Sequence, residues 1–282
     1  MIKKRISISI GILLLIAFIV VCIFCVFKYS KKGYWEIKEP LPVVQGNTWY
    51  KDNKVVMHAT GGINGLSYTN SKDSLLHNIK QGAKVIEIDF NYTSDKHLVC
   101  FHKKEDFYYP AIKDLTFETF KNTKVQGMYE PLIFEDVLEI MREYPEIYIS
   151  IDTKHDVLSE IIEDVVKLCP DQELLDRFII QCYYPGEKEK ISQIYNFPND
   201  NYLFAPYKYS DDPYDTLRVC YEEGFNVVVV NKSIWTPDVF KLFRSKNIYL
   251  YVYTVNRMDM ADLVLDLGVW GIYTDFLVDY KS

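Results

Sequence analysis

Short apolar segments alternate with amphipathic segments along most of the chain, and this alternation predicts a barrel of parallel strands. Eight apolar runs are expected to form buried strands, at residues 55–59, 85–90, 147–152, 177–182, 202–205, 226–231, 249–255 and 271–275. Amphipathic stretches between them predict helices, at residues 71–82, 155–169, 213–224, 236–247 and 258–268. Parallel strands joined by helices have right-handed crossovers. Eight such units therefore predict an α/β protein that closes into a (β/α)8 TIM barrel.

A ninth apolar run predicts a hairpin above the second strand. Residues 98–102 follow that strand after a turn at residues 94–96. This connection is too short for a parallel crossover, so we expect the run to return antiparallel. The return would bring His102 to the level of Glu87 and Asp89.

The N-terminal residues predict a membrane anchor. The 22 residues from 6 to 27 carry no charge, and as a helix they would span roughly 33 Å, enough to cross a bilayer. No small-residue cleavage site follows, so we expect an uncleaved, single-pass transmembrane helix in contact with membrane lipid. Basic residues flank this segment on both sides, and we favour a domain outside the cytoplasm, attached to the cell membrane. The predicted organisation is a basic N-terminus at 1–5, an anchor at 6–28, a linker at 29–53 and a barrel at 54–282.

Polar side chains cluster at the ends of three predicted strands. Residues two apart in a strand share a face, so Glu87 and Asp89 should project together into the barrel. The same spacing places Asp152 and Lys154 on one face, and His58 ends the first strand. All of these are carboxyl ends of strands, where barrel enzymes carry their active sites.

These residue types together favour phosphodiester chemistry. Three buried carboxylates repel one another unless a cation lies between them, and oxygen ligands suit Mg²⁺ or Ca²⁺. His58 and His102 could act as acid and base, and Lys154 could contact an anionic oxygen. Metal, lysine and two histidines in one place predict metal-dependent cleavage of a phosphodiester.

Each residue also has a purely structural interpretation. Glu87 and Asp89 could form an ion pair with a buried base, and Asp152 could cap the following helix. Either histidine could be a hydrogen-bonded core residue. These interpretations weaken together, because all the positions fall at strand ends on one face.

Composition adds few further constraints. A net charge of −7 without a basic stripe argues against nucleic acid as a partner. The 23 tyrosines are either a compositional bias or rings that line a site for sugars, choline-like groups or lipid. Of the six cysteines, Cys22 and Cys25 lie in the predicted anchor. The other four show no metal-ligand spacing and are interpreted as buried free thiols. The sequence does not indicate an oligomeric state.

The segments HATGG and YTNSKDSLLHNIKQGAKVIEIDFNYTSDKHLVCFH, within residues 58–102, resemble the signature of the glycerophosphodiester phosphodiesterase family. The likeness continues through Pro131 and Leu132 before a helix to YTVN at 253–256 and GVWGIYTD at 268–275. It implies a TIM barrel that cleaves glycerophosphodiesters with a divalent cation, Mg²⁺ or Ca²⁺. The roles implied are metal ligands (Glu87, Asp89, Asp152), an acid/base pair (His58, His102) and substrate contacts (Lys154, Gln181, Tyr253, Asn256).

The sequence departs from the family pattern at several of these positions. Ala59 stands where the family has Arg, Thr69 and Asp152 where it has Glu, Lys103 where it has Asp, and Tyr253 where it has Trp. The sequence therefore leaves two candidate functions. The first is a membrane-anchored, metal-dependent hydrolase of a phosphodiester in a lipid headgroup or cell-surface polymer. The second is a non-catalytic barrel that binds an anionic glycan or headgroup in a surface-polymer assembly. A glycosidase fits less well, because Glu87 and Asp89 point the same way from one strand.

Overall fold

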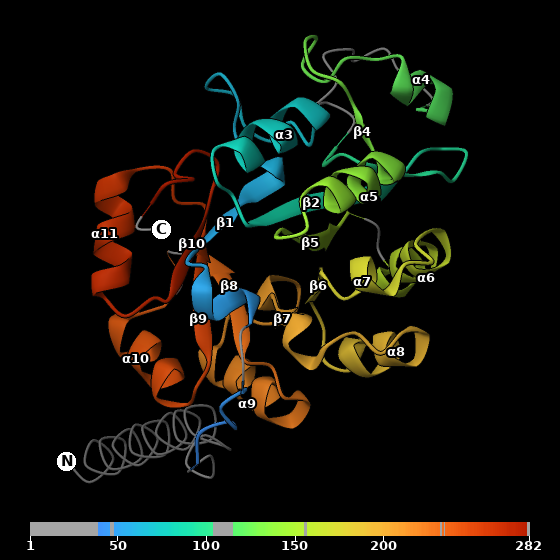
Figure 1. Cartoon of the computed structure of the whole chain (residues 1–282). Coiled ribbons are helices and arrows are strands. Elements are labelled where there is room, and N and C mark those ends of the chain that lie inside the picture. The colour runs from blue at the N-terminus through green and yellow to red at the C-terminus, as the bar shows by residue number, and fades with distance from the viewer. Residues whose placement is uncertain are drawn as a thin grey trace, which may run out of the picture. The chain divides into compact units, whose positions relative to one another are not determined.

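Parallel strands close into a barrel in the computed structural model, which describes residues 39–45, 48–103, 115–154, 157–231, 233 and 235–280. Its strands are β1 (Val55–Met57), β2 (Val85–Tyr92), β5 (Tyr148–Thr153), β6 (Phe178–Cys182), β7 (Tyr202–Phe204), β8 (Val227–Asn231), β9 (Tyr249–Tyr253) and β10 (Gly271–Thr274). Their order is β1-β10-β9-β8-β7-β6-β5-β2, and pairing of β1 with β2 closes the ring (Figure 1). The predicted TIM barrel is confirmed.

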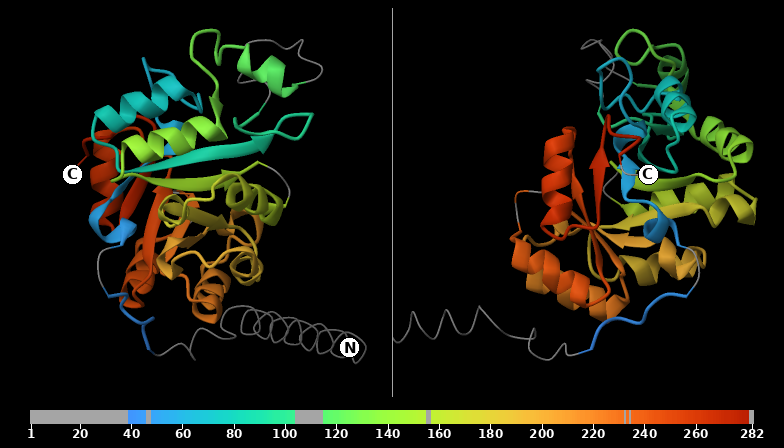
Figure 2. Two further views of the ribbon diagram at one scale, coloured as in Figure 1. Left: turned by 45° about the vertical axis from the view of Figure 1, so that its right-hand side comes forward. Right: turned by 60° about the vertical axis from the view of Figure 1, so that its left-hand side comes forward.

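Helices surround the barrel, as the views in Figure 2 show. The longer ones are α3 (Lys72–Lys80), α5 (Phe134–Glu143), α6 (Leu158–Leu168), α8 (Glu187–Ile194), α9 (Pro213–Glu223), α10 (Pro237–Ser245) and α11 (Met258–Asp266). Shorter turns are α2 (Trp49–Asp52), η2 (His58–Thr60), α4 (Phe117–Lys121), α7 (Gln172–Leu175), η4 (Asn199–Asn201) and η5 (Pro206–Lys208). All five predicted helices are confirmed. The pattern did not predict α8, because its sequence EKEKISQI carries few apolar positions.

The strand faces follow the predicted alternation. Glu87 lies beside Ser150 in the register of β2 and β5, and Asp89 lies beside Asp152. Ile86, Ile88 and Phe90 of β2 are fully buried on the other side, where Phe90 meets Phe134 of α5 with ring centroids 6.0 Å apart. On β2 and β5, one face therefore packs against helices, and the other carries the acids into the barrel mouth.

The predicted hairpin is also confirmed. β3 (Leu98–Cys100) pairs antiparallel with β2, and β4 (Leu132–Ile133) pairs antiparallel with β3. Phe101 extends the pairing through its N–H, which donates to the Asp89 carbonyl at 2.9 Å. A small apolar cluster that includes Phe101 and Phe120 holds this excursion together. His102 therefore returns to the level of the β2 acids.

The short helix α2 closes the opposite end of the barrel. Trp49 and Tyr50 are 2% and 0% exposed, within the apolar core inside the strands. The Tyr50 carbonyl accepts from the Trp270 indole N–H at 2.7 Å and the Tyr251 hydroxyl at 3.2 Å. The compact unit begins at Leu41. The last part of the predicted linker thus packs as part of the barrel, because its aromatic residues fill the barrel floor.

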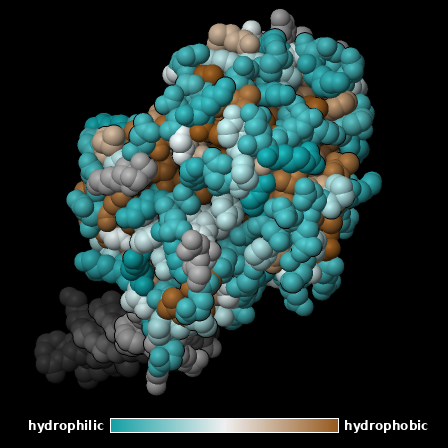
Figure 3. Space-filling model, viewed as in Figure 1, coloured by the Kyte–Doolittle hydropathy of each residue, from teal (hydrophilic) through white to brown (hydrophobic). Residues whose placement is uncertain are grey.

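The predicted anchor at 6–28 and the basic segment at 1–5 lie outside the described residues. Among the residues that the structure does describe, no helix is both long enough and apolar enough to cross a membrane. The face of the barrel shown in Figure 3 is mainly hydrophilic, with apolar side chains scattered between polar ones.

The floor of the barrel yields a stability prediction. Trp49→Ala should lower the free energy of unfolding by about 3–5 kcal/mol, because it removes a buried aromatic side chain and leaves a cavity. Denaturant unfolding followed by circular dichroism measures this change. Val43→Ala is the control, since Val43 is 59% exposed. Equal unfolding midpoints for the two variants would show that α2 does not contribute to the core.

Candidate active site

A cavity of about 200 Å³ opens at the carboxyl ends of the barrel strands. It lies where the neighbouring strands β2 and β5 present their acids. The residues that line it are His58, Tyr68, Glu87, His102, Asp152, Lys154, Gln181, Ala205, Tyr207, Val229, Tyr253 and Tyr273. Seven residues of the predicted site are among them, so strands far apart in the sequence bring these side chains to one place.

Three carboxylates converge at the base of this cavity. Glu87, Asp89 and Asp152 each offer one oxygen, and these oxygens lie within 4.8 Å of one another. The residues are 1%, 1% and 8% exposed, so water screens their charges poorly. Burial and the neighbouring Asp89 charge hold the pKa of Glu87 well above its ordinary range. Such a cluster requires positive charge to stay ionised.

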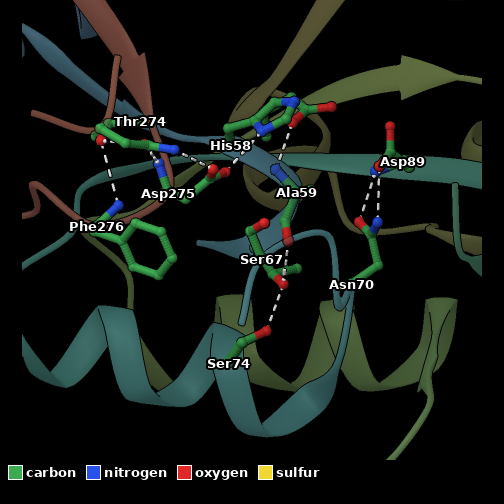
Figure 4. Close-up of polar contacts among 12 residues, drawn as sticks. His58, Ala59, Ser67, Asn70, Ser74, Asp89, Thr274, Asp275 and Phe276 are labelled. Carbon is green, nitrogen blue, oxygen red and sulfur yellow. Dashed lines mark hydrogen bonds and ion pairs between the residues drawn. The ribbon is translucent and has the colours of Figure 1, made fainter. Parts of the chain in front are cut away.

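Backbone and amide donors orient the two acids of β2, as Figure 4 shows in part. The Ala59 N–H donates to Glu87 Oε2 at 2.6 Å, from a backbone in the left-handed region at φ 49°. The Asn70 side-chain amide donates to Asp89 Oδ2 at 2.7 Å, and its oxygen accepts from the Asp89 N–H at 3.0 Å. Glu87 Oε1 is buried and has no hydrogen-bond partner among the described residues.

Lys154 brings a positive charge to the acid cluster. Its Nζ lies 2.9 Å from Asp89 Oδ1 and 2.6 Å from Asp152 Oδ2. Burial by itself lowers the pKa of Lys154, but the charges of Asp89, Asp152 and Glu87 outweigh this and raise it. Conversely, Lys154 lowers the pKa of Asp89 against the opposing effect of burial. Lys154 is therefore charged, and it links the carboxylates of Asp89 and Asp152.

The third acid is held from the neighbouring strand β6. The Tyr183 hydroxyl donates to Asp152 Oδ1. The same hydroxyl accepts from the Thr153 N–H at 2.9 Å and the Gln181 amide at 3.3 Å. One carboxylate oxygen of Asp152 is thus bound by Tyr183 on the β6 side, and the other contacts Lys154.

His58 is fixed by a hydrogen-bonded chain from β10. Its Nδ1 lies 2.8 Å from Asp275 Oδ1, and the Asn256 amide donates to Asp275 Oδ2 at 2.6 Å (Figure 4). Burial lowers the pKa of His58, but the Asp275 hydrogen bond and the charge of Glu87 outweigh it and raise the pKa to about 9. His58 consequently holds its proton at neutral pH.

His102 approaches the cavity from the hairpin and meets Tyr68. The Tyr68 ring makes edge contacts with both histidines, with centroids 4.6 Å from His58 and 5.3 Å from His102. His102 Nδ1 is buried without a partner among the described residues. A tyrosine therefore separates the two rings that the sequence predicts as an acid/base pair.

Tyrosines form the side of the cavity opposite the histidines. Tyr207 lies between Tyr183 and Tyr253, with ring centroids 5.5 and 6.4 Å away. Gln181 lines the cavity next to them. The predicted substrate residues Gln181 and Tyr253 thus border the cavity from β6 and β9.

Asn256 and Asp89 are the two predicted site residues outside the cavity lining. Asp89 lies behind it, where its carboxylate joins the acid cluster. Asn256 is exposed, and its amide is bound to Asp275 rather than turned to the cavity. The structure therefore does not bring Asn256 to the position expected of a substrate contact, because β9 ends at Tyr253 and Asn256 lies on the loop that follows.

Several residues of the site were not predicted, among them Tyr68, Asn70, Tyr183, Tyr207 and Asp275. Asp275 ends the last predicted strand, so its position at the mouth was open to the same reasoning that found His58. Tyr183 continues the inward face of Gln181 at a spacing of two. Asn70 and Tyr68 lie on a loop without periodicity, and only the tertiary structure reveals their contacts.

Comparison with known proteins adds independent findings. The family model for the glycerophosphoryl diester phosphodiesterase family matches residues 62–278. A glycerophosphodiester phosphodiesterase of Bacillus altitudinis is 24% identical over 229 residues, covering 76% of this chain and 92% of the relative.

Solved structures share the fold. One is a glycerophosphodiester phosphodiesterase from Parabacteroides distasonis, with a TM-score of 0.64, 21% identity and coverage of 81% of this chain and 94% of the other. Another is a phosphodiesterase from Oleispira antarctica in complex with the product sn-glycerol-3-phosphate, with a TM-score of 0.63, 14% identity and coverage of 81% and 95%.

The family model covers the chain from residue 62 to beyond the end of β10, which is well over half of its length. This match agrees with the acids and histidines that the structure gathers in one cavity. The chain belongs to the glycerophosphoryl diester phosphodiesterase family and is a phosphoric diester hydrolase.

Proposed function

We propose that this protein hydrolyses a glycerophosphodiester in the cavity at the barrel mouth, with the help of a bound divalent cation. The observation that carries the proposal is the convergence of three carboxylates, Lys154 and two histidines on one cavity. The products would be a glycerol phosphate and a free alcohol.

The residues present fit a divalent cation. Glu87 Oε1 is a buried carboxylate oxygen without a partner among the described residues, which is costly unless a cation completes it. Asp89 and Asp152 add one oxygen each toward the same centre. An all-oxygen donor set suits Mg²⁺ or Ca²⁺. When bound, the cation would act as a Lewis acid that withdraws charge from the phosphoryl oxygens.

The two histidines divide the proton transfers. His58 holds a proton at neutral pH and would donate it to the leaving alcohol oxygen as the P–O bond breaks. His102 would accept a proton from the nucleophile, whose oxygen forms the new P–O bond. The nucleophile is water, or a neighbouring hydroxyl of the substrate that closes a cyclic phosphate.

Lys154 would bind the phosphate. Among the cavity-lining residues in the described part of the chain it is the sole lysine or arginine, and Ala59 adds no charge where the family has Arg. Gln181, Tyr207 and Tyr253 border the space left for the alcohol. We infer a glycerophosphodiester-like substrate, a lipid headgroup or a cell-surface polymer, in line with the glycerol phosphate product bound to the Oleispira antarctica phosphodiesterase.

We also propose that residues 6–27 anchor the protein in the cell membrane as a single helix, with the barrel outside the cytoplasm. The support is the 22-residue run without charge. The full-length chain should stay in the membrane fraction after carbonate washing, at its uncleaved mass. A soluble product that lacks the first 30 or so residues would instead identify a secretory signal peptide.

Metal binding is testable by calorimetry on the full-length protein in detergent after treatment with chelator. Titration with Mg²⁺ or Ca²⁺ should reveal one site, and Glu87→Gln should weaken it at least tenfold by removing a charged ligand. Glu146→Gln is the matched control, since Glu146 lies on the exposed side, 3.4 Å from Lys84. If Glu87→Gln bound as tightly as the wild type, Glu87 would not be a ligand.

The acid/base assignment predicts activity losses. His58→Ala and His102→Ala should each lower kcat by about 10²- to 10⁴-fold on a glycerophosphodiester substrate. The double variant should lose little more than the worse single one, because the two residues act as a unit. His77→Ala and His97→Ala are controls outside the cavity lining. Full activity of His102→Ala would refute the pairing.

The pH profile tests the role of His58 separately. Its pKa is raised from the ordinary 6.5 to about 9, so the acid form persists at neutral pH and is lost as pH rises through the raised value. The alkaline limb of kcat/KM should therefore lie above pH 6.5. Asp275→Asn removes the bonded charge and should shift this limb to lower pH. An unchanged limb in Asp275→Asn would show that another group controls it.

A further inference from the structure

The three acids of the cluster share one arrangement. In each, a neutral donor holds one carboxylate oxygen, and each residue offers one oxygen to a group whose members lie within 4.8 Å of one another. The neutral donors are the Ala59 N–H for Glu87, the Asn70 amide for Asp89 and the Tyr183 hydroxyl for Asp152. The other oxygens are Glu87 Oε1, which has no partner among the described residues, and Asp89 Oδ1 and Asp152 Oδ2, which contact Lys154.

Tyr183 is the donor whose direction can be deduced from its other contacts. A phenol oxygen has one proton to donate and two lone pairs. The Thr153 N–H and the Gln181 amide both donate to that oxygen, so they occupy the lone pairs. The single proton is then directed to Asp152, which can only accept while it is ionised.

Because it is buried, the Tyr183 hydroxyl cannot donate its proton to solvent instead. Tyr183 is 1% exposed and belongs to the apolar core inside the barrel. Burial, followed by the Asp152 charge, raises the pKa of Tyr183 well above its ordinary value, so the phenol stays protonated. Asp152 Oδ1 is therefore held on the β6 side by Tyr183, and Oδ2 is the oxygen that contacts Lys154.

We propose that Tyr183 is a positioning residue that restricts Asp152 to ligation through one oxygen and thereby makes the site prefer Mg²⁺ over Ca²⁺. Mg²⁺ requires near-octahedral geometry and single-oxygen ligands, whereas Ca²⁺ accepts carboxylates that bind through both oxygens in irregular geometry. A fixed Asp152 suits the smaller ion. This inference rests on the proposed metal site, and it goes beyond that proposal by assigning the choice of ion to one hydroxyl.

The test compares Tyr183→Phe with the wild type by calorimetry, with Mg²⁺ and Ca²⁺ in turn, on the full-length protein in detergent. The wild type should bind Mg²⁺ more tightly than Ca²⁺. Tyr183→Phe should bind Mg²⁺ about 10- to 100-fold more weakly, as expected for loss of a group that orients a ligand. Ca²⁺ affinity should fall less, because the released Asp152 can use both oxygens.

Tyr207→Phe is the matched control. Its ring packs against Tyr183 at 5.5 Å, and in the described part of the chain its hydroxyl makes no hydrogen bond to any of the three acids. It should leave both affinities within about twofold. An equal loss of Mg²⁺ and Ca²⁺ affinity in Tyr183→Phe, or the same loss in Tyr207→Phe, would overturn the proposal.

A double-mutant cycle separates positioning from general destabilisation. In an Asp152→Ala background, Tyr183→Phe should cause no further change in Mg²⁺ affinity, since the residue on which it acts is gone. An additive loss would contradict the proposal. If Tyr183→Phe did not fold, Gln181→Met provides a second route, because it frees one lone pair of the hydroxyl. It should weaken Mg²⁺ binding in the same direction, and unchanged binding would count against the inference.

The two proposals fail in different ways. A wild type that bound neither cation would refute the metal site and, with it, the role of Tyr183. A wild type whose site is lost in Glu87→Gln but kept with the same ion preference in Tyr183→Phe would refute only the role of Tyr183.

Discussion

Repulsion among three buried carboxylates is the constraint on which the rest of this site depends. Glu87, Asp89 and Asp152 are almost completely shielded from water, and their oxygens lie within 4.8 Å of one another. An isolated charge in such surroundings is costly, and like charges add to the cost. The surrounding structure offsets this repulsion with a neutral donor to each acid and with the charge of Lys154 beside Asp89 and Asp152. A barrel that only needed stability would place apolar residues here.

The same constraint explains how the site separates its roles. The hydrogen bond from Asp275 and the charges of the acid cluster raise the pKa of His58, so this histidine keeps a proton at neutral pH. His102 arrives from a hairpin outside the barrel, and its ring contacts Tyr68. Two histidines in different surroundings can serve as acid and base. The surroundings of the two rings differ in position and in neighbouring charge, although the residue type is the same.

Ala59 illustrates how one departure from the family pattern is accommodated. Its side chain brings no charge to the phosphate, but its N–H donates to Glu87 from a left-handed backbone. A backbone donor does not depend on the identity of the side chain. An Ala where the family has Arg is therefore compatible with the orientation of Glu87, and among the described residues that line the cavity Lys154 is the sole lysine or arginine.

Much of the fold followed from the sequence alone, because it depends on local periodicity. The alternation within residues 85–90 determines which side chains face the barrel, and it correctly placed Glu87 and Asp89 together. The short turn before β3 determined the hairpin and the return of His102. In contrast, the sequence predicts a linker where Trp49 and Tyr50 form the barrel floor. Aromatic residues near prolines and glycines carry no periodic signal.

Only the tertiary structure decided which long-range contacts complete the site. His58 and Asp275 are 217 positions apart, and they meet because β1 pairs with β10 when the barrel closes. Asn256 meets Asp275 because β9 pairs with β10. Tyr183 reaches Asp152 because β6 lies beside β5. Periodicity specifies the face on which a side chain lies, whereas its hydrogen-bond partner depends on strand order, stagger and loop shape, which are properties of the closed barrel.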